Sequence, residues 1–179
     1  MTAPRLPRSE LVLGGARSGK TAFALERAEA SGLEPVMVAT AEAWDDEMRA
    51  RIAAHRAERG DRWSTIEETR DLVGVLDRAA APHRILVVDC LTLWLSNQTF
   101  AEADVAAETE RLVAALGRLS GPVILVSNEV GLGIVPENAL ARRFRDDQGR
   151  LNRRVAAAVE RVTFVAAGLP LVLKGGDVS

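Results

Sequence analysis

The residues with the clearest chemistry lie near the start of the chain, where they form a phosphate-binding pattern. The sequence reads Gly14-Gly15-Ala16-Arg17-Ser18-Gly19-Lys20-Thr21 and fits G-x-x-x-x-G-K-[ST]. In this pattern, backbone N–H groups close around phosphate oxygens, the lysine neutralises the β- and γ-phosphates, and the hydroxyl holds Mg²⁺. Short patterns also match by chance, but an apolar run before it and a helical pattern after it supply the required order. We expect residues 14–21 to bind a nucleotide, with Lys20 in catalysis and Thr21 on the metal.

Asp89 is the second candidate, because it ends the apolar run over residues 85–88. Open α/β sheets bind their ligands at the carboxyl ends of the strands, where this carboxylate would lie. An aspartate there can also cap the next loop, but the phosphate-binding pattern upstream favours a ligand for nucleotide-bound Mg²⁺. Thr92, Trp94 and Asn97 follow. They fit either a substrate-facing loop or packing that seats the next helix, and the sequence leaves both interpretations open.

His55 is the third candidate, and it lies in a helical pattern over residues 45–59 that begins with acidic residues. A lone histidine beside apolar neighbours is more often a packing residue than a catalyst. Its neighbours in the sequence are unusually basic, with Arg49, Arg51, Arg56 and Arg59 nearby. A neutral imidazole among such guanidiniums is able to attack a phosphorus and form a phosphoramidate. The spacing of His55 favours a packing residue, and the positive charge around it favours a nucleophile. The residues alone leave both interpretations of His55 open.

The elements that must position these residues alternate between apolar runs and helical patterns. The expected strands are 11–13, 35–40, 84–89, 122–128 and 162–166. The expected helices are 21–31, 45–59, 68–80, 103–119 and 139–160, with a break near Gln148-Gly149 as an open alternative. Continuous apolar strands are typical of parallel sheets buried on both faces, and the alternation predicts an α/β layered fold. The turn 168–170 is too short to hold a helix, so 171–174 should pair antiparallel with the preceding strand.

Composition sets outer limits on function. The 179 residues suggest one domain over 1–179, and a formal net charge of −2 gives no general attraction to nucleic acid or anionic membranes. Cys90 is the only cysteine, so neither an intrachain disulfide nor a cysteine-based metal site fits, and a reducing cytoplasm is expected. Residues 1–10 hold no apolar core of a signal peptide and are expected to be a loose tail, and no later stretch reaches membrane-spanning length.

Several motifs occur together in the order of one known family. Besides 14–21 they are Ala39-Thr40, 45–48, Arg51-Ile52, His55-Arg56, Trp63 and the run Asn-Glu-Val-Gly-Leu-Gly-Ile-Val-Pro-Glu-Asn over 128–138. With them the chain resembles the bifunctional adenosylcobinamide kinase/adenosylcobinamide-phosphate guanylyltransferase family of cobalamin biosynthesis. The resemblance covers nearly the whole chain. The fold it leads us to expect is an α/β P-loop (RecA-like) layered fold, mostly parallel, with a C-terminal antiparallel strand.

The resemblance implies two reactions. ATP or GTP phosphorylates adenosylcobinamide, and GTP then donates GMP to adenosylcobinamide phosphate through a guanylylated histidine, giving adenosylcobinamide-GDP and pyrophosphate. It places the guanylylated histidine at His55, because His83 lies outside every motif. It also implies Mg²⁺ at Thr21 and Asp89, and a homo-oligomer, specifically a trimer. Beyond residues 14–21, the nucleotide-binding residues it implies are Ala39, Thr40, Ala41, Arg56, Ala57, Glu58, Arg59, Glu67 and Asp89.

Other functions remain as alternatives. A monofunctional P-loop small-molecule kinase would need no histidine nucleophile, and a nucleotide-binding module would release no pyrophosphate. A RecA-like motor would share the sheet, but neither charge nor length offers a track for a polynucleotide. The segment 128–138 is expected to be a loop at the active edge that shapes a corrinoid-side pocket, contacts a neighbouring subunit or is simply a constrained turn. The arginines between 142 and 154 are typical of a solvated helix face.

Overall fold

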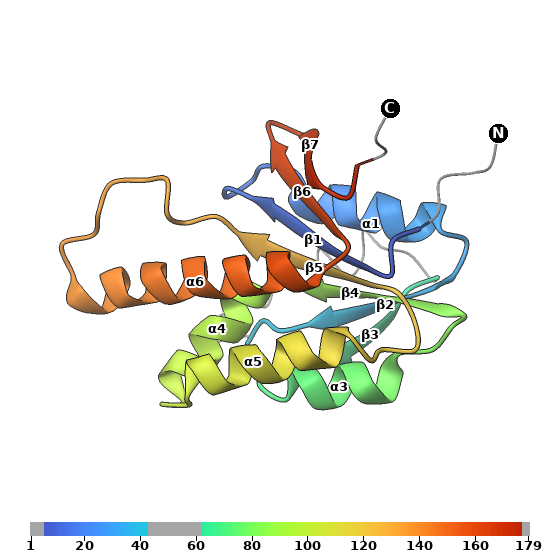
Figure 1. The fold of residues 1–179 in the computed structure, drawn as a ribbon, viewed down its shortest axis with the longest axis horizontal. Helices are drawn as coiled ribbons and strands as arrows, with labels where there is room; N and C mark the ends of the chain where they lie inside the picture. Colours follow the sequence, from blue (N-terminus) through green and yellow to red (C-terminus); the bar gives the residue numbers. More distant parts are fainter. Residues whose placement is uncertain (1–5, 43–61, 177–179) are drawn as a thin grey trace.

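A seven-stranded sheet organises the part of the chain that the structure, a computed structural model, describes, namely residues 6–42 and 62–176 (Figure 1). The strand order is β3-β2-β4-β5-β1-β6-β7, and every neighbouring pair is parallel except β6 with β7. The expected α/β fold with a C-terminal antiparallel strand is therefore confirmed. The strands are β1 (Ser9–Gly14), β2 (Glu34–Ala39), β3 (Ser64–Glu67), β4 (Arg84–Asp89), β5 (Val123–Asn128), β6 (Arg161–Ala166) and β7 (Leu169–Lys174).

The helices lie on both faces of this sheet. One face is covered by α1, and the other by the remaining helices of the described part (Figure 1). Under α1, Ala24 and Ala28 pack with Val12, Val87 and Val126 of three neighbouring strands. The opposite face carries the larger apolar cluster, built around Trp94 and the leucines of the other helices. The helices are α1 (Lys20–Ala30), α3 (Leu72–Ala79), α4 (Leu91–Phe100), α5 (Val105–Leu116) and α6 (Ala139–Ala158).

Burial explains why the apolar runs form these strands. All six residues of β1 are buried, as are the inner residues of β4 and β5, because each of these strands has neighbours on both sides and helices above and below. By contrast, β7 is the exposed edge strand. It is joined to β6 by a two-residue turn in which Ala167 and Gly168 have φ of 51° and 78°. Two positive φ values are typical of a type I′ turn, which matches the twist of a hairpin.

Several boundaries differ from those the sequence predicts. The loose tail expected over residues 1–10 extends too far, because Ser9 and Glu10 belong to β1 and are buried. Helix α3 begins at Leu72 after an Asp71 cap, and α5 begins after an Asp104 cap that accepts from the N–H of Ala107. Helix α6 runs through 148–149 without a break. The expected helix over 45–59 lies outside the described residues.

Two elements are not among those that the sequence predicts. Strand β3 spans four residues that are exposed or half-buried, so its apolar signal is weak. Helix α4 starts directly after β4 and buries polar as well as apolar residues, so it lacks the one-sided pattern that marks a helix. Within the described residues, no helix is long and apolar enough to cross a membrane.

Candidate functional site

The P-loop, residues 14–21, connects the carboxyl end of β1 to the start of α1 as expected. The N–H of Ser18 donates to the carbonyl of Gly15 at 3.3 Å, and Lys20 Nζ donates to the same carbonyl at 3.0 Å. Gly19 precedes α1 with a φ of 94°, a conformation that glycine adopts without steric cost. The loop thus leads directly into the N-terminus of α1, and the dipole at such a helix end favours the binding of an anion.

Gly14 is required at its position because the loop folds tightly over it. A Cβ there would lie 2.6 Å from the carbonyl oxygen of Val165 and closer still to Ser18 Oγ. The loop is also held from β6 and β7, since the N–H of Gly168 donates to the carbonyl of Ser18 at 2.8 Å. A Cβ at Gly15 would meet nothing within 4 Å, so this residue faces open space. Two neighbouring glycines therefore have different roles in the same loop.

Asp89 ends β4 at the same edge of the sheet as the P-loop. Strand β5 alone separates β4 from β1, and in register Asp89 lies level with Val126 of β5 and Val12 of β1. Burial, and to a smaller extent the negative charge of Asp89, raise the pKa of the Cys90 thiol from 9.0 to about 11, while the positive charge of Lys20 lowers it. Lys20 follows the P-loop at the end of β1 and Asp89 ends β4, so both residues belong to the carboxyl edge of the sheet.

These residues fit a magnesium ion that is bound with a nucleotide. Mg²⁺ prefers hard oxygen ligands, and the carboxylate of Asp89 and the hydroxyl of Thr21 are of that kind. Among the described residues, no group of three His, Cys, Asp or Glu side chains is placed to hold a metal. Mg²⁺ does not need such a group, because it keeps several waters and takes phosphate oxygens as ligands. The donor set therefore suits a metal that arrives with phosphate.

Ala39 and Glu67 end the next two strands at this edge, paired in register with each other, and Thr40 follows directly. Thr40 is fully buried, and its polar groups bond within the protein. Its Oγ1 donates to the carbonyl of Cys90 at 2.7 Å and accepts from the Cys90 N–H at 2.9 Å. Its carbonyl accepts from Asn97 Nδ2 at 2.8 Å. Through these bonds Thr40 joins the ends of β2 and β4. Its contact with a nucleotide stays a prediction.

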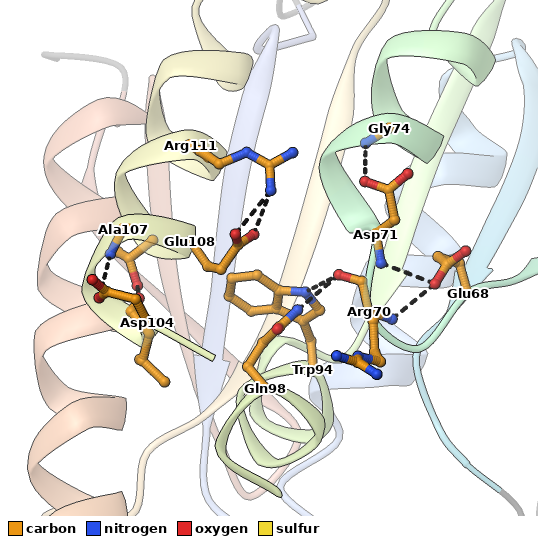
Figure 2. A network of polar contacts seen from close by, with 12 residues as sticks. Glu68, Arg70, Asp71, Gly74, Trp94, Gln98, Asp104, Ala107, Glu108 and Arg111 are labelled. Atoms are coloured by element: carbon orange, nitrogen blue, oxygen red, sulfur yellow. Dashed lines mark hydrogen bonds and ion pairs between the residues drawn. The ribbon is translucent and has the colours of Figure 1, made fainter. Parts of the chain in front are cut away.

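The turn after Glu67 is held by α4, as Figure 2 shows for two of the contacts. Trp94 Nε1 and Gln98 Nε2 both donate to the carbonyl of Arg70, at 3.0 and 2.8 Å. Asn97 Nδ2 reaches the carbonyl of Thr69 at 2.9 Å. On the outer side of this turn, Glu68 accepts from the N–H groups of the two residues that precede α3. Of the two interpretations of this segment, the structure supports packing.

Of the two histidines in the chain, His83 lies among the described residues. His83 is exposed at the amino end of β4, where its Nε2 lies 3.8 Å from Glu34, at the opposite edge from the P-loop. The expected nucleophile and its neighbours lie outside the described residues, namely His55, Arg56, Ala57, Glu58 and Arg59. Their roles stay predictions.

The loop between β5 and α6, residues 129–138, has an unusual surface. Leu132 and Ile134 are 83% and 97% exposed. Val130 and Pro136 line a cavity of about 420 Å³ together with side chains of α4 and α6, among them Phe144. Exposed apolar side chains beside a cavity are typical of a binding surface. A corrinoid-side pocket and a subunit contact both fit this surface.

Comparison with known proteins identifies the family. The model of a family described as "Cobinamide kinase / cobinamide phosphate guanyltransferase" matches residues 10–173. The chain belongs to this cobinamide kinase/guanyltransferase family. Relatives in the family include the bifunctional adenosylcobalamin biosynthesis protein CobP of Pseudomonas aeruginosa, 49% identical over 168 residues, which are 93% of this chain and 97% of that protein. The CobU proteins of Salmonella typhimurium and Escherichia coli are 40% and 37% identical, over 92% of this chain and 98% of each of them.

Solved structures place this cobinamide kinase/guanyltransferase chain among P-loop folds of the RecA type. The RadB recombinase superposes with a TM-score of 0.54 at 20% identity, over 89% of this chain and 74% of that one. The flagellar accessory protein FlaH of Methanocaldococcus jannaschii gives 0.57 at 11% identity, over 97% and 84%. Such low identities bear on the fold alone, and they confirm the expected fold class.

Proposed function

We propose that this chain phosphorylates adenosylcobinamide with ATP or GTP and then transfers GMP from GTP to the new phosphate. The observation that carries the proposal is the P-loop, with Lys20 and Asp89 at the same edge of the sheet, in a member of this family. Each step cuts the same kind of triphosphate, but at a different phosphorus. The product of the second step is adenosylcobinamide-GDP, and pyrophosphate leaves.

In the kinase step, the P-loop holds the phosphates and stabilises the negative charge on their oxygens. The hydroxyl of the substrate attacks the γ-phosphorus and gives its proton to solvent, the bond from the γ-phosphorus to the β,γ-bridging oxygen breaks, and ADP or GDP leaves. Lys20 and the N–H groups at the start of α1 face the oxygens that gain negative charge. Asp89 and Thr21 would hold Mg²⁺, which neutralises part of that charge when bound. The work of the protein is therefore orientation and electrostatic stabilisation.

The transferase step needs a nucleophile, and the family resemblance assigns it to His55. A neutral imidazole nitrogen attacks the α-phosphorus of GTP, and the bond to pyrophosphate breaks. An oxygen of adenosylcobinamide phosphate then attacks the same phosphorus, the P–N bond breaks and the imidazole is regenerated. Arg56 and Arg59 stabilise the charge of the leaving pyrophosphate in this proposal.

Labelling at the α-phosphorus tests the transferase step directly. After incubation with α-labelled GTP and Mg²⁺, the protein should carry a label that is lost in acid and survives base, as a phosphoramidate does. His55→Ala should abolish this label, whereas His83→Ala, which removes the only other histidine, should keep it. Lys20→Ala should lower phosphorylation of adenosylcobinamide by about 10²-fold or more, as loss of a charge-stabilising group does.

The alternative is a monofunctional P-loop kinase, and the same experiment separates the two functions. Phosphorylation without a protein-bound label or pyrophosphate release would establish the kinase alone. The proposal also includes a cytoplasmic homotrimer. The exposed apolar side chains of the loop 129–138 support an assembly of subunits, and light scattering at micromolar concentration would measure its mass.

A further inference from the structure

The arginine-rich stretch of α6 lines a polar cavity. The sequence predicts a solvated helix face for these arginines, and the structure adds a cavity of about 460 Å³ where α6 meets the loop 129–138. This loop leaves the end of β5 and returns to the start of α6 (Figure 1). The cavity, here called the arginine pocket, is lined by Gly131, Arg145, Asp146, Gly149, Arg150 and Arg153.

A chain of hydrogen bonds connects the arginine pocket to the P-loop. The N–H of Glu129 donates to the carbonyl of Gly14 at 3.0 Å, and Glu129 Oε1 accepts from the N–H of Gly131 at 2.5 Å. The carbonyl of Gly131 in turn accepts from Arg145 Nη2 at 2.7 Å. Within residues 6–42 and 62–176, Arg145 makes no other hydrogen bond or ion pair. Its guanidinium is therefore held in place while most of its N–H donors remain for a ligand.

The charges around the arginine pocket leave it positive. Arg150 is offset by Asp147, whose Oδ1 lies 2.8 Å from Arg150 Nη1. Arg145 and Arg153 have no acidic partner in the described part of the chain, and Asp146 adds one negative charge to the wall. The positive charge is local, because the whole chain has a formal net charge of −2. A cavity of this kind attracts an anion.

Gly149 gives a second indication of a ligand. Glycine in the interior of a helix is less stable than alanine, and Gly149 lies well inside α6. A Cβ at this position would meet nothing within 4 Å, so packing in the described structure does not require a glycine. Because Gly149 lines the arginine pocket, a side chain there would occupy part of the cavity. The glycine keeps this space open and lets a ligand approach the helix backbone closely.

The arginine pocket adjoins the apolar cavity described above. Arg145 lines both of them, and Val130 and Phe144 belong to the apolar one. An apolar space and a positively charged space therefore lie on either side of one guanidinium. This pair of spaces matches a ligand that has a large ring body and a phosphate on an arm.

We propose that the arginine pocket binds the phosphate group of adenosylcobinamide phosphate, the acceptor of GMP. The inference rests on the proposed function and locates the acceptor within it. The transferase step needs two anion sites at once, because GTP occupies the P-loop while the acceptor phosphate is held elsewhere. Arginine suits the second site, since its planar fork can bind two phosphate oxygens together. The arginines hold these oxygens, and another oxygen of the same phosphate attacks the α-phosphorus as described above.

Equilibrium dialysis tests the assignment without turnover. The ligands are adenosylcobinamide phosphate and adenosylcobinamide, each with saturating GDP and Mg²⁺, since GDP occupies the P-loop and has no γ-phosphoryl group to donate. The wild-type protein should prefer the phosphorylated ligand. Arg153→Ala should reduce this preference about 5-fold or more, because charge-assisted hydrogen bonds to the phosphate are lost. In the transferase reaction it should raise KM for the acceptor, while labelling by α-labelled GTP stays as in the wild type.

Two further variants separate a phosphate contact from a general effect on α6. Arg143→Ala removes the same charge from the same helix, at a residue that is 79% exposed and does not line the pocket. It should keep the preference within about 2-fold. Gly149→Ala should lower the preference about 5-fold because its methyl group fills ligand space, yet raise the midpoint of thermal unfolding because alanine favours the helix. If Arg153→Ala fails to fold, Gly149→Ala decides the question.

The expected outcome is a reduced preference in Arg153→Ala and Gly149→Ala but not in Arg143→Ala. An equal reduction in Arg143→Ala would assign the effect to the general charge of α6 and overturn the inference. A wild-type protein without a preference, or a preference that survives in both pocket variants, would overturn it as well. In these cases the label at His55 would still support the proposed function.

A competition arm distinguishes the acceptor from free phosphate. Inorganic phosphate and pyrophosphate are titrated into the wild type and Arg153→Ala under the same conditions. If either anion binds in an Arg153-dependent way while the two corrinoids bind equally, the pocket holds a free anion and the assignment to the acceptor is wrong. A wild-type protein that binds neither corrinoid would overturn the proposed function and, with it, this inference.

Discussion

The N–H of Gly168 donates to the carbonyl of Ser18 at 2.8 Å, so the turn between β6 and β7 holds the P-loop in place. These residues are 150 positions apart in the sequence, and the bond joins the antiparallel hairpin to the phosphate-binding loop. The same turn approaches the next residue of the loop, because a Cβ on Gly19 would lie 3.2 Å from the Cα of Gly168. The exposed edge of the sheet thereby contributes to the shape of the nucleotide site.

Breaking this bond should weaken nucleotide binding. Gly168 has a φ of 78°, which proline cannot adopt, and proline also lacks the N–H donor. We expect Gly168→Pro to lower the free energy of unfolding by at least about 2 kcal/mol, from backbone strain and one lost hydrogen bond. It should also weaken GTP binding about 10-fold or more, since an unsupported loop must be ordered by the ligand. Fluorescence titration with a labelled GTP analogue measures the affinity.

Gly168→Asn is the matched control, because asparagine tolerates positive φ and keeps the N–H. It should bind GTP within about 3-fold of the wild-type affinity. If folded Gly168→Pro protein binds GTP as tightly as the control, the hairpin does not support the P-loop.

The two glycines that open the P-loop should respond differently to the same substitution. A methyl group at Gly14 meets the backbone oxygen of Val165, which cannot move aside, whereas a methyl group at Gly15 meets nothing within 4 Å. We expect Gly14→Ala to cost about 1–3 kcal/mol of stability, as overpacking does, and Gly15→Ala to cost less than about 1 kcal/mol. Thermal unfolding of the two variants side by side gives the comparison. Equal midpoints would show that the loop rearranges freely around Gly14.

The sequence predicts those parts of the fold that depend on strong local signals. Apolar runs bounded by turns mark the five parallel strands other than β3, and the short turn before β7 gives its direction. The signal fails where burial is unusual. Helix α4 buries Thr92, Asn97 and Gln98 among apolar residues, so it shows no polar face. In α6, Gly149 lies within the helix because its exposed position requires no side chain.

In the candidate site, too, residues specified by a local signal are predicted from the sequence, and residues whose partners depend on strand order are not. A motif specifies the P-loop because its glycines and lysine act through local backbone geometry, and Asp89 follows from its place after a strand. Thr40 shows the limit, since its hydroxyl bonds to Cys90, 50 positions away, and this partner is decided by strand order alone. Asn128 shows it too, because only the order β4-β5-β1 places it between Asp89 and the P-loop.

At the opposite edge of the sheet, a buried carboxylate should be important for stability. Glu10 is 1% exposed, accepts from Arg27 Nη2 at 2.9 Å and Thr163 Oγ1 at 2.8 Å, and lies 3.6 Å from Arg161 Nε. Removing one partner of a buried pair leaves charge uncompensated, so Glu10→Ala should cost about 3 kcal/mol in urea unfolding. Both arginines are about a quarter exposed, which places the expected value at the low end of the range.

The double variant tests whether the cost is due to the ion pair. If uncompensated charge is the cause, Glu10→Ala with Arg27→Ala should be less destabilised than the sum of the two single variants. A strictly additive result would assign the cost to lost packing. Nucleotide affinity should stay unchanged in Glu10→Ala, because the P-loop lies at the other end of β1.

The thiol of Cys90 should make stability fall at alkaline pH. Burial raises its pKa from 9.0 to about 11 in the folded protein, so the folded state keeps the proton when the unfolded chain has lost it. Below pH 9 both states are protonated and the contribution is fully present. As pH rises from 9 toward 11, the unfolded state binds fewer protons and the free energy of unfolding decreases. At pH 10.5 the loss should be about 2 kcal/mol relative to pH 8.

Comparison with Cys90→Ala isolates this titration, because every other group titrates in both proteins. The chain has no tyrosine, so lysine and arginine are the other side chains that titrate at high pH. Urea unfolding at pH 8 and pH 10.5 should give a smaller decrease for Cys90→Ala than for the wild type, by about the same 2 kcal/mol. An equal decrease in both proteins would mean that the thiol ionises in the folded state as readily as in the unfolded one. Since Lys20 lowers the pKa of the folded thiol, Lys20→Ala should extend the decrease to still higher pH, while its onset stays at the pKa of the unfolded thiol.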